Sequence, residues 1–112
     1  ANGKGVSQDH KEAVKWYRKA AEQGNAPAQL NLGGMYLNGD GVSQNYKEVF
    51  KWYRKSAQKG LVDAQYYMGV MYYKGNGAPR DYVMALMYWN IAAAAGYQNA
   101  IKYRDMVMDF LK

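Results

Sequence analysis

Residues 26–60 read APAQLNLGGMYLNGDGVSQNYKEVFKWYRKSAQKG, and this stretch contains the pattern that decides the fold. Small and apolar residues recur at three- and four-residue intervals on both sides of Gly39-Asp40-Gly41, which is the spacing of an amphipathic helix. A glycine-rich tripeptide between two such segments is typical of a tight turn. The stretch therefore predicts two helices that form a hairpin.

The same pattern occurs before and after this stretch at an offset of 36 residues. Residues 3–38 and 39–74 match at 19 of 36 positions without a gap, whereas residues 39–74 and 75–110 match at 7 of 36. The third copy keeps the glycines and small residues and changes most of the others. Self-similarity at this period predicts helical units stacked into a solenoid.

Each copy is expected to contain a longer helix and then a shorter one. Capping residues and glycines delimit the longer helices, which we expect from near Asp9 to Gly24, near Asn45 to Gly60 and near Asp81 to Gly96. Glutamate follows the first two caps by three residues, at Glu12 and Glu48, and this spacing predicts capping boxes. The shorter helices follow within about two residues, as the turn residues indicate, so the chain is expected to hold six helices.

We interpret residues 1–112 as one repeat domain. Its units are 3–38, which starts in mid-unit and suggests a fragment of a longer protein, 39–74, and a divergent 75–112. Arg104 and Asp105 replace the Leu-Gly of the first unit, so the last helix is expected to be a terminal cap. Small residues should let adjacent helices approach closely, and these are Ala20, Ala21, Ala28 and Gly33. Bulky residues should fill the space that remains between the layers, and these are Trp16, Leu32 and Tyr36.

Composition excludes several classes of function. The 112 residues contain no cysteine, which excludes disulfide scaffolds and thiolate sites, and only one histidine. The nine acidic residues are scattered, and no pair has a spacing that argues for acid–base catalysis. No apolar run reaches the roughly 18 residues of a membrane span. We therefore expect no enzyme activity, no metal, no cofactor and no transmembrane segment.

Two motifs and the histidine have chemical alternatives that their surroundings do not support. Gly-x-Gly could cradle a phosphate, but here it joins two helices and no Lys-Ser or Lys-Thr follows. A calcium loop that starts at Asn38 would need a glutamate at its twelfth position, where Val49 stands. His10 lacks partners for a metal or a proton relay, so we expect it to be solvated.

Residues 26–60 resemble the Sel-one-like repeat family, a relative of the tetratricopeptide repeats. The residues that carry the resemblance are Ala28-Gln29, Leu32-Gly33, Tyr36, Gly39-Asp40-Gly41-Val42, Lys47, Trp52-Tyr53, Lys55 and Ala57. Asn45 and Val49 depart from the Asp and Ala of the family pattern, and residues 3–24 fit its second half. The resemblance extends over nearly the whole chain and fades from about Gln98.

This resemblance implies an all-α fold, a right-handed α-solenoid superhelix of antiparallel helical hairpins. It also implies a non-catalytic adaptor that binds a protein or peptide partner in its concave groove. The family is common among bacterial envelope and secreted proteins. This tilts the expected location toward the bacterial periplasm or exterior and leaves the cytoplasm open.

The shorter helices would line the concave groove, by analogy with the tetratricopeptide pattern. The side chains expected there are Leu30, Gly34, Leu37 and Asn38, then Asp63, Tyr66, Val70, Tyr73 and Lys74, and finally Asn99, Lys102, Met106 and Phe110. Tyrosine is enriched at interfaces, so replacing Tyr66 and Tyr73 by alanine is expected to weaken a partner without unfolding the domain. Tyr67 and Tyr103, one position away, are expected to pack between helices.

Basic residues form a second pattern on the outer face of the longer helices. Lys11, Lys15, Arg18 and Lys19 recur as Lys47, Lys51, Arg54 and Lys55, within a net charge of +6. The simplest explanation is a solvated helix face. The alternatives are docking on an acidic protein or an anionic membrane surface, or on nucleic acid, which is the least favoured partner.

The third unit interrupts this basic stripe with Val83, Met87 and Ile91, four residues apart. An exposed apolar stripe is typical of a contact surface, which predicts contact with another chain, including self-association through residues 81–95. The alternative is that the last helix, or a rotation of this one, covers the stripe.

Overall fold

A computed structural model describes the backbone of residues 3–112 and the side chains of residues 9–112. Within residues 3–112 it contains six α-helices and no strand. The helices are α1 (Gly3–Glu22), α2 (Ala26–Asn38), α3 (Tyr46–Gln58), α4 (Val62–Lys74), α5 (Tyr82–Ala94) and α6 (Gln98–Leu111). The predicted all-α repeat fold with six helices is confirmed. The predicted alternation of longer and shorter helices is wrong, because α2, α3, α4 and α5 have 13 residues each and α6 has 14.

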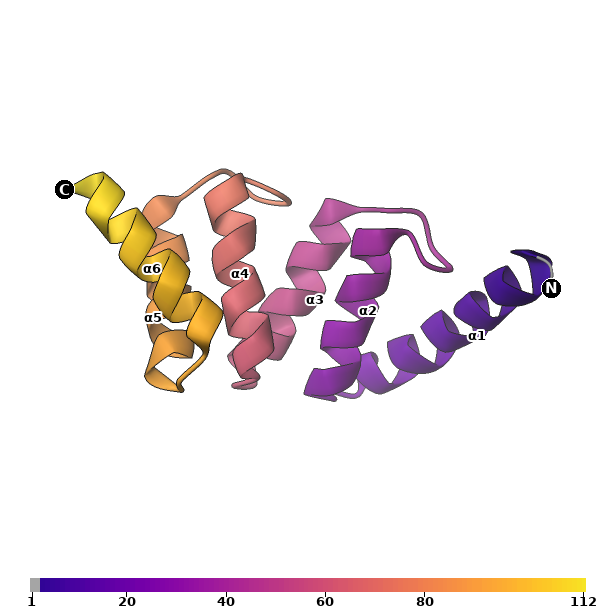
Figure 1. The fold of residues 1–112 in the computed structure, drawn as a ribbon. Helices are drawn as coiled ribbons and strands as arrows, with labels where there is room; N and C mark the ends of the chain where they lie inside the picture. The colour runs from indigo at the N-terminus through magenta and orange to yellow at the C-terminus, as the bar shows by residue number, and fades with distance from the viewer. Residues whose placement is uncertain (1–2) are drawn as a thin grey trace.

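The helices form an elongated, two-layered body (Figure 1). α1, α3 and α5 make one layer and α2, α4 and α6 make the other, and each helix packs against the next one along the chain. The body measures 51 × 24 × 24 Å, and the two termini lie at opposite ends. Packing between neighbours along one axis is the arrangement of a solenoid.

Three buried clusters follow one another along this body, each shared between neighbouring helices. Their buried members are Val14, Ala21, Ala28, Leu32 and Trp52, then Val49, Tyr53, Ala57, Ala64, Met68 and Met71, and finally Tyr66, Ala85, Trp89, Ala92, Ala100 and Val107. The buried members of the first and third clusters come from three helices each, and those of the second come from α3 and α4, with Leu30 and Tyr88 of the neighbouring helices packed against them. Each unit therefore depends on its neighbours for burial.

Glycine allows the closest approach between the two layers. A Cβ at Gly33 would lie 2.6 Å from the ring of Tyr53, and a Cβ at Gly69 would overlap the indole of Trp89. Each aromatic ring therefore rests on the backbone of the preceding helix. The role predicted for Gly33 is confirmed, and Gly69 repeats it one unit later.

Polar side chains cap the starts of α2, α3 and α5, and left-handed glycines follow α1, α3 and α5. The predicted caps at Asn45 and Asp81 are confirmed, and Asn25 is a further cap that was not predicted. The side-chain oxygens of Asn25, Asn45 and Asp81 accept hydrogen bonds from backbone N–H groups at the starts of α2, α3 and α5. Gly24, Gly60 and Gly96, which follow α1, α3 and α5, have φ values of 92°, 97° and 85°. Glycine adopts this left-handed conformation without the cost that a side chain would add.

The predicted capping box at Asn45 and Glu48 is wrong in its second half. The backbone N–H of Asn45 donates to the carbonyl oxygen of Tyr36 at 3.1 Å. The carboxylate of Glu48 instead accepts from the indole Nε1 of Trp52 at 3.2 Å. The Glu48 carboxylate therefore bonds to the Trp52 side chain, whereas the capping box would require it to bond to the backbone N–H of Asn45.

The start of α1 also differs from the prediction. The helix begins at Gly3 and not near Asp9, so Asp9 lies in its interior and cannot cap its start with Glu12. The later Gly-x-Gly turns pack on a preceding helix, where a Cβ at Gly41 would lie 2.6 Å from the backbone of His10. Residues 3–8, which are equivalent to the later turns, are helical in this structure.

Trp16 does not fill the space between layers, and that prediction is wrong. Its side chain is 64% exposed, whereas its equivalent 36 residues later, Trp52, is 3% exposed. Trp52 is buried because it packs against Ala28 and Leu32 of the preceding helix α2. No described helix precedes α1, so Trp16 has nothing equivalent to pack against.

Candidate protein-binding surfaces

Side chains from α2 and α4 line a cavity of about 420 Å³, which we call the α2–α4 cavity. It brings together Leu30, Gly34, Leu37, Asn38 and Asp63 from the predicted groove. The other lining residues are Asn31, Met35, Asp40, Tyr53 and Tyr67. Helices that are consecutive in their layer therefore contribute to one concave surface, as solenoid stacking requires.

The α2–α4 cavity combines apolar walls with negative charge. Leu30, Leu37 and two tyrosine rings supply the apolar area, and Asp40 and Asp63 are its only charged lining residues. The Tyr53 and Tyr67 rings stack with centroids 5.4 Å apart. Burial, and secondarily the neighbouring Tyr67, raises the pKa of the Tyr53 hydroxyl to about 12. Tyr53 therefore stays neutral, and a hydrogen-bonding group, at physiological pH.

The structure gives two adjacent tyrosines roles that differ from those the sequence suggests. Tyr66 is only 9% exposed and packs in the cluster around Trp89, with its ring stacked on that of Tyr97. Tyr67 is 37% exposed and lines the α2–α4 cavity, and its ring also stacks on that of Tyr53, so it both packs against α3 and borders the cavity. Replacing Tyr66 would remove core contacts, which makes it unsuitable as a probe of binding.

A smaller cavity lies between α4 and α6. Its volume is about 160 Å³, and its lining residues are Tyr73, Tyr82, Met106, Val107 and Phe110. Three predicted groove residues, Tyr73, Met106 and Phe110, therefore meet here. Lys74, Asn99 and Lys102 are exposed and Val70 is half-buried, and none of these four lines either cavity.

The apolar stripe on α5 is open to solvent. Val83, Met87 and Ile91 are 74%, 42% and 45% exposed. Neither α6 nor a rotation of α5 covers them among the described residues, so the covering alternative is wrong. Contact with another chain stays a prediction.

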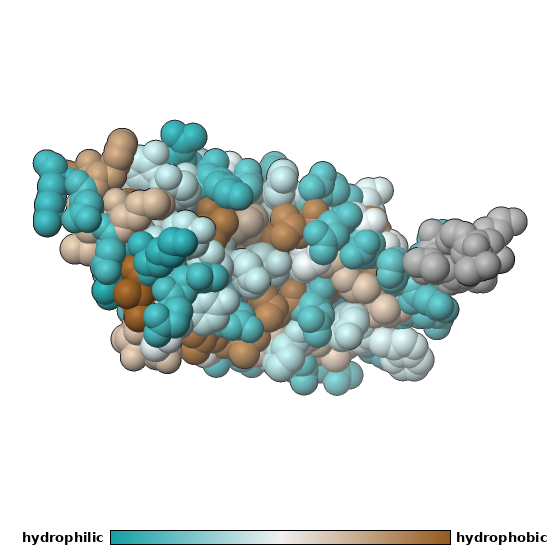
Figure 2. All heavy atoms as spheres, viewed as in Figure 1, coloured by the Kyte–Doolittle hydropathy of each residue, from teal (hydrophilic) through white to brown (hydrophobic). Residues whose placement is uncertain are grey.

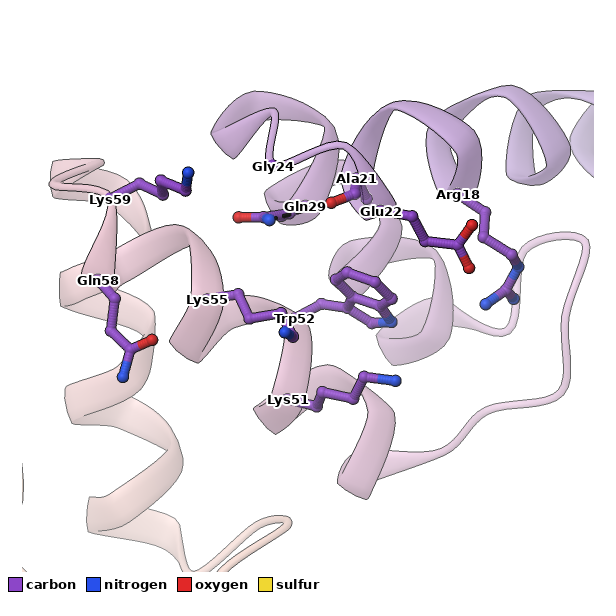
Figure 3. Close-up of a pocket in the computed structure, with 10 residues that line it drawn as sticks. All are labelled: Arg18, Ala21, Glu22, Gly24, Gln29, Lys51, Trp52, Lys55, Gln58 and Lys59. Atoms are coloured by element: carbon purple, nitrogen blue, oxygen red, sulfur yellow. Dashed lines mark hydrogen bonds between the residues drawn. The ribbon is translucent and has the colours of Figure 1, made fainter.

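Another cavity lies in the layer that contains α1, α3 and α5, whereas the predicted groove is on the layer of α2, α4 and α6. This α1–α3 cavity of about 530 Å³ contains Arg18 and Glu22 from α1 and Lys51 and Lys55 from α3 (Figure 3). The remaining lining residues are Ala21, Gly24, Gln29, Trp52, Gln58 and Lys59. The sequence indicated the basic stripe, but it gave no signal for the cavity or for the parts of Gln29 and Lys59 in it.

Arg18 is held at the edge of this cavity. Its guanidinium donates a hydrogen bond to the Tyr36 hydroxyl and lies over the same ring, 5.7 Å from the centroid. The hydrogen bond is the main cause that raises the pKa of Arg18, so the side chain stays charged. A positive charge is therefore fixed in place before any ligand arrives.

Other kinds of site find no support in the part of the chain that the structure describes. No three His, Asp or Glu side chains lie together in an arrangement that could hold a metal ion. None of the described helices is long and apolar enough to cross a membrane. Figure 2 shows hydrophobic residues as separate patches among hydrophilic ones on the face in view.

Comparison with known proteins supports a repeat architecture. A family model described as Sel1 repeat matches residues 1–25, 26–61 and 62–97. It divides the same 36-residue period so that α2 pairs with α3 and α4 pairs with α5. No protein of curated function matches the sequence.

Solved structures of similar fold come from several bacteria. A Sel1 repeat protein from Oxalobacter formigenes is 40% identical with a TM-score of 0.80, over 82% of this chain and 69% of that one. A protective antigen with an SLR fold, from uropathogenic Escherichia coli, is 44% identical with a TM-score of 0.75, over 77% of this chain. This chain corresponds to 18% of that antigen's length. Helicobacter pylori cysteine rich protein B, 22% identical, shares the fold with a TM-score of 0.76, over 80% of this chain and 68% of that one.

Proposed function

The chain belongs to the Sel1 repeat family, whose members generally mediate protein–protein interaction, and we propose that it binds a peptide segment of a partner protein in the α2–α4 cavity. Proteins of this family are generally non-catalytic scaffolds. The proposal accordingly involves recognition without a chemical step.

The observation that carries the proposal is the convergence of predicted groove residues on one cavity. Leu30 and Leu37, together with Tyr67, which was not predicted there, supply apolar walls to a cavity of about 420 Å³, large enough for one or two side chains of a peptide. Asp40 and Asp63 add negative charge at the same place. A segment that carries an apolar side chain next to a lysine or arginine would satisfy both features.

Peptide selection tests this proposal without a known partner. A displayed library of random peptides is selected on the protein, and the dissociation constants of the recovered peptides are measured by fluorescence anisotropy. The test variant combines Asp63→Ala with Tyr67→Ala, because both side chains are exposed and line the cavity. Tyr46→Ala is the matched control, since Tyr46 is 41% exposed and lies outside the cavity.

We expect recovered peptides rich in Lys or Arg beside an apolar residue, with affinity at least about tenfold weaker for the double variant, equivalent to 1.4 kcal/mol. The control should bind as the unmodified protein does. Unchanged affinity for the double variant, with its helical circular dichroism intact, would show that peptides bind elsewhere.

A second contact surface is favoured by the exposure of Val83, Met87 and Ile91. We propose that a second copy of this chain covers the stripe, with the two α5 helices side by side. Three apolar side chains form a small interface compared with stable dimers, so this association would be weak and concentration-dependent.

A further inference from the structure

The α1–α3 cavity is separate from the α2–α4 cavity and has the opposite charge. Arg18, Lys51, Lys55 and Lys59 face a single lining carboxylate, that of Glu22. Lysines 51, 55 and 59 are spaced four residues apart along α3 and its end, so their ammonium groups line one side of the opening (Figure 3). Positive charge in a recess attracts anionic groups more strongly than the same charge on a flat surface.

The lysine ammonium groups have little competition from protein carboxylates. Lys51 lies 3.9 Å from Glu48, and both side chains are partly exposed, so the pair is weak. No ion pair of Lys55 or Lys59 occurs within the described residues. A ligand carboxylate could therefore bind these groups without first breaking a strong ion pair.

The ring of an aromatic side chain lies near two of these ammonium groups. The Nζ atoms of Lys51 and Lys55 lie 4.7 and 6.0 Å from the ring centroid of Trp52, within range of a cation–π interaction. Trp52 is itself held in place, because it is buried and its indole donates to Glu48. The cationic wall is thus organised in the absence of a ligand.

A buried amide adds a second requirement on the ligand. Gln29 is 3% exposed, and its Nε2 donates to the carbonyl oxygen of Ala21 at 3.1 Å. Its Oε1 accepts no hydrogen bond from any described residue, although buried amide oxygens almost always have a donor. Figure 3 shows this oxygen pointing toward the opening between Lys55 and Lys59. This oxygen is itself buried, so a ligand N–H group would reach it only if the side chains at the opening moved aside; the cavity would then present an unpaired acceptor beside the cationic groups.

We propose that the α1–α3 cavity binds an acidic peptide segment. Its glutamate or aspartate carboxylates pair with Lys51, Lys55 and Lys59, and a backbone N–H of the same segment donates to Oε1 of Gln29. This site is independent of the one proposed for the α2–α4 cavity, which takes a cationic segment. One chain could then hold two segments of opposite charge on its two faces.

The same features disfavour phosphate-based ligands. Phosphate oxygens are acceptors, so a phosphate group pairs with the lysines but cannot itself satisfy Oε1 of Gln29, whereas each residue of a peptide other than proline carries a backbone N–H beside its side chain. A nucleic acid also needs a basic track many residues long. Here the lysines of α3 are followed on α5 by Met87 and Ile91 at the equivalent positions.

The test uses a fluorescein-labelled octapeptide of alternating glutamate and alanine, with anisotropy as the readout. Lys51→Met, Lys55→Ile and Lys59→Ala together give the cavity the residues that stand 36 positions later. The control triple, Lys11→Ala, Lys47→Ala and Lys112→Ala, removes the same charge from exposed positions outside the cavity. Circular dichroism checks that both triples are folded.

We expect at least about tenfold weaker binding by the cavity triple and less than about threefold weakening by the control triple. A peptide with glutamine in place of glutamate should not bind. Equal loss of affinity for the two triples would overturn the proposal, since it would show that only net charge matters.

Three further probes separate the ligand classes. An acidic peptide with N-methylated amides keeps the carboxylates and lacks the N–H donors, so it should bind more weakly; equal binding would overturn the role of Gln29. Oligo-thymidylate and phosphatidylserine vesicles should bind more weakly than the peptide at matched salt. Tighter binding of either, lost in the cavity triple, would reassign the site to nucleic acid or to a membrane surface.

Discussion

The α1–α3 cavity and the surface between α3 and α5 occupy equivalent places in successive units, yet their chemistry is opposite. Lys51, Lys55 and Lys59 border the first, and the residues 36 positions later are Met87, Ile91 and Ala95. The first surface is cationic and recessed, and the second is apolar. The difference shows that a few outward-facing side chains decide which ligand a repeat can recognise.

The packing beneath the two surfaces is the same. The Tyr53 ring rests on Gly33 in one unit, and the Trp89 ring rests on Gly69 in the next. Buried glutamine side chains repeat as well, since Gln29 donates to Ala21 and its equivalent Gln65 donates to the carbonyl oxygen of Ala57 at 3.4 Å. The units therefore share one scaffold, and the outward-facing residues are free to diverge.

The largest effect should come from breaking the shared packing. We expect Gly69→Ala to lower the free energy of unfolding by about 2–3 kcal/mol, because its Cβ would overlap the buried Trp89 indole. Gly34→Ala is the control, since its Cβ would lie 3.8 Å from the Tyr53 hydroxyl. That variant should gain up to about 1 kcal/mol of helix propensity. Urea unfolding measures both, and a Gly69→Ala protein as stable as the original would contradict the packing account.

Alkaline pH should act on only one of the two equivalent aromatic contacts. The pKa of Tyr53 is about 12 in the folded chain and about 10 when unfolded. Its neutral form is thus favoured by folding. The contribution of neutral Tyr53 to the free energy of unfolding is fully present below pH 10. About 2–3 kcal/mol of it is lost as the pH rises toward 12. Trp89, the equivalent residue, does not titrate.

The measurement is the free energy of unfolding at pH 9 and pH 11.5 for the original protein and for Tyr53→Phe. The phenylalanine variant should lose less stability over this interval, while Tyr66, Tyr88 and Tyr97 titrate in both proteins. An identical loss in the two proteins would mean that Tyr53 ionises without cost in the folded state.

Placing lysines at the outward-facing positions of α5 should give the next unit the ability to bind an acidic peptide. We expect Met87→Lys, Ile91→Lys and Ala95→Lys together to create a second acidic-peptide site, raising the stoichiometry from one peptide to two in calorimetry. The new site should be up to about tenfold weaker, equivalent to 1.4 kcal/mol, because Tyr88 replaces Trp52 beneath it. A stoichiometry that stays at one, with the original affinity, would show that lysines at these positions are insufficient.

The smallest effect concerns self-association through the α5 stripe. Met87→Glu should reduce the weight-average mass measured by sedimentation at high protein concentration, because it places a charge in an apolar contact. Lys47→Glu, on the basic helix α3, is the matched control and should leave the mass unchanged. If the original protein is monomeric at the highest concentration tested, the proposed α5 contact is wrong.

Much of the fold could be predicted from the sequence, because each unit repeats the same local signals. The cap at Asp81 and the left-handed Gly24 act through neighbouring backbone atoms, so their effect is readable locally. The start of α1 and the exposure of Trp16 could not be predicted in this way. In the second unit, preceding helices pack against the equivalent turn and against the equivalent tryptophan, Trp52. No described helix precedes α1.

The candidate sites were harder to predict because α4 packs between α3 and α5. A helix with neighbours on both sides has apolar residues nearly all round, so periodicity cannot separate its buried face from its exposed one. Analogy with the tetratricopeptide pattern placed Tyr66 in the groove and Tyr67 in the packing, whereas in the structure Tyr66 is buried and Tyr67 is exposed. The α1–α3 cavity combines residues from three helices, and the spacing within any one of them does not reveal it.

The most direct test of the difference between the two surfaces is a nuclear magnetic resonance titration with the alternating Glu-Ala peptide. The chain has three tryptophans, so the indole N–H signals of Trp16, Trp52 and Trp89 report on successive units. The account predicts concentration-dependent shifts of the Trp52 indole and the Gln29 side-chain amide, with Trp89 unchanged. Shifts at Trp89, or no shift at Trp52 and Gln29 while the peptide binds, would contradict it.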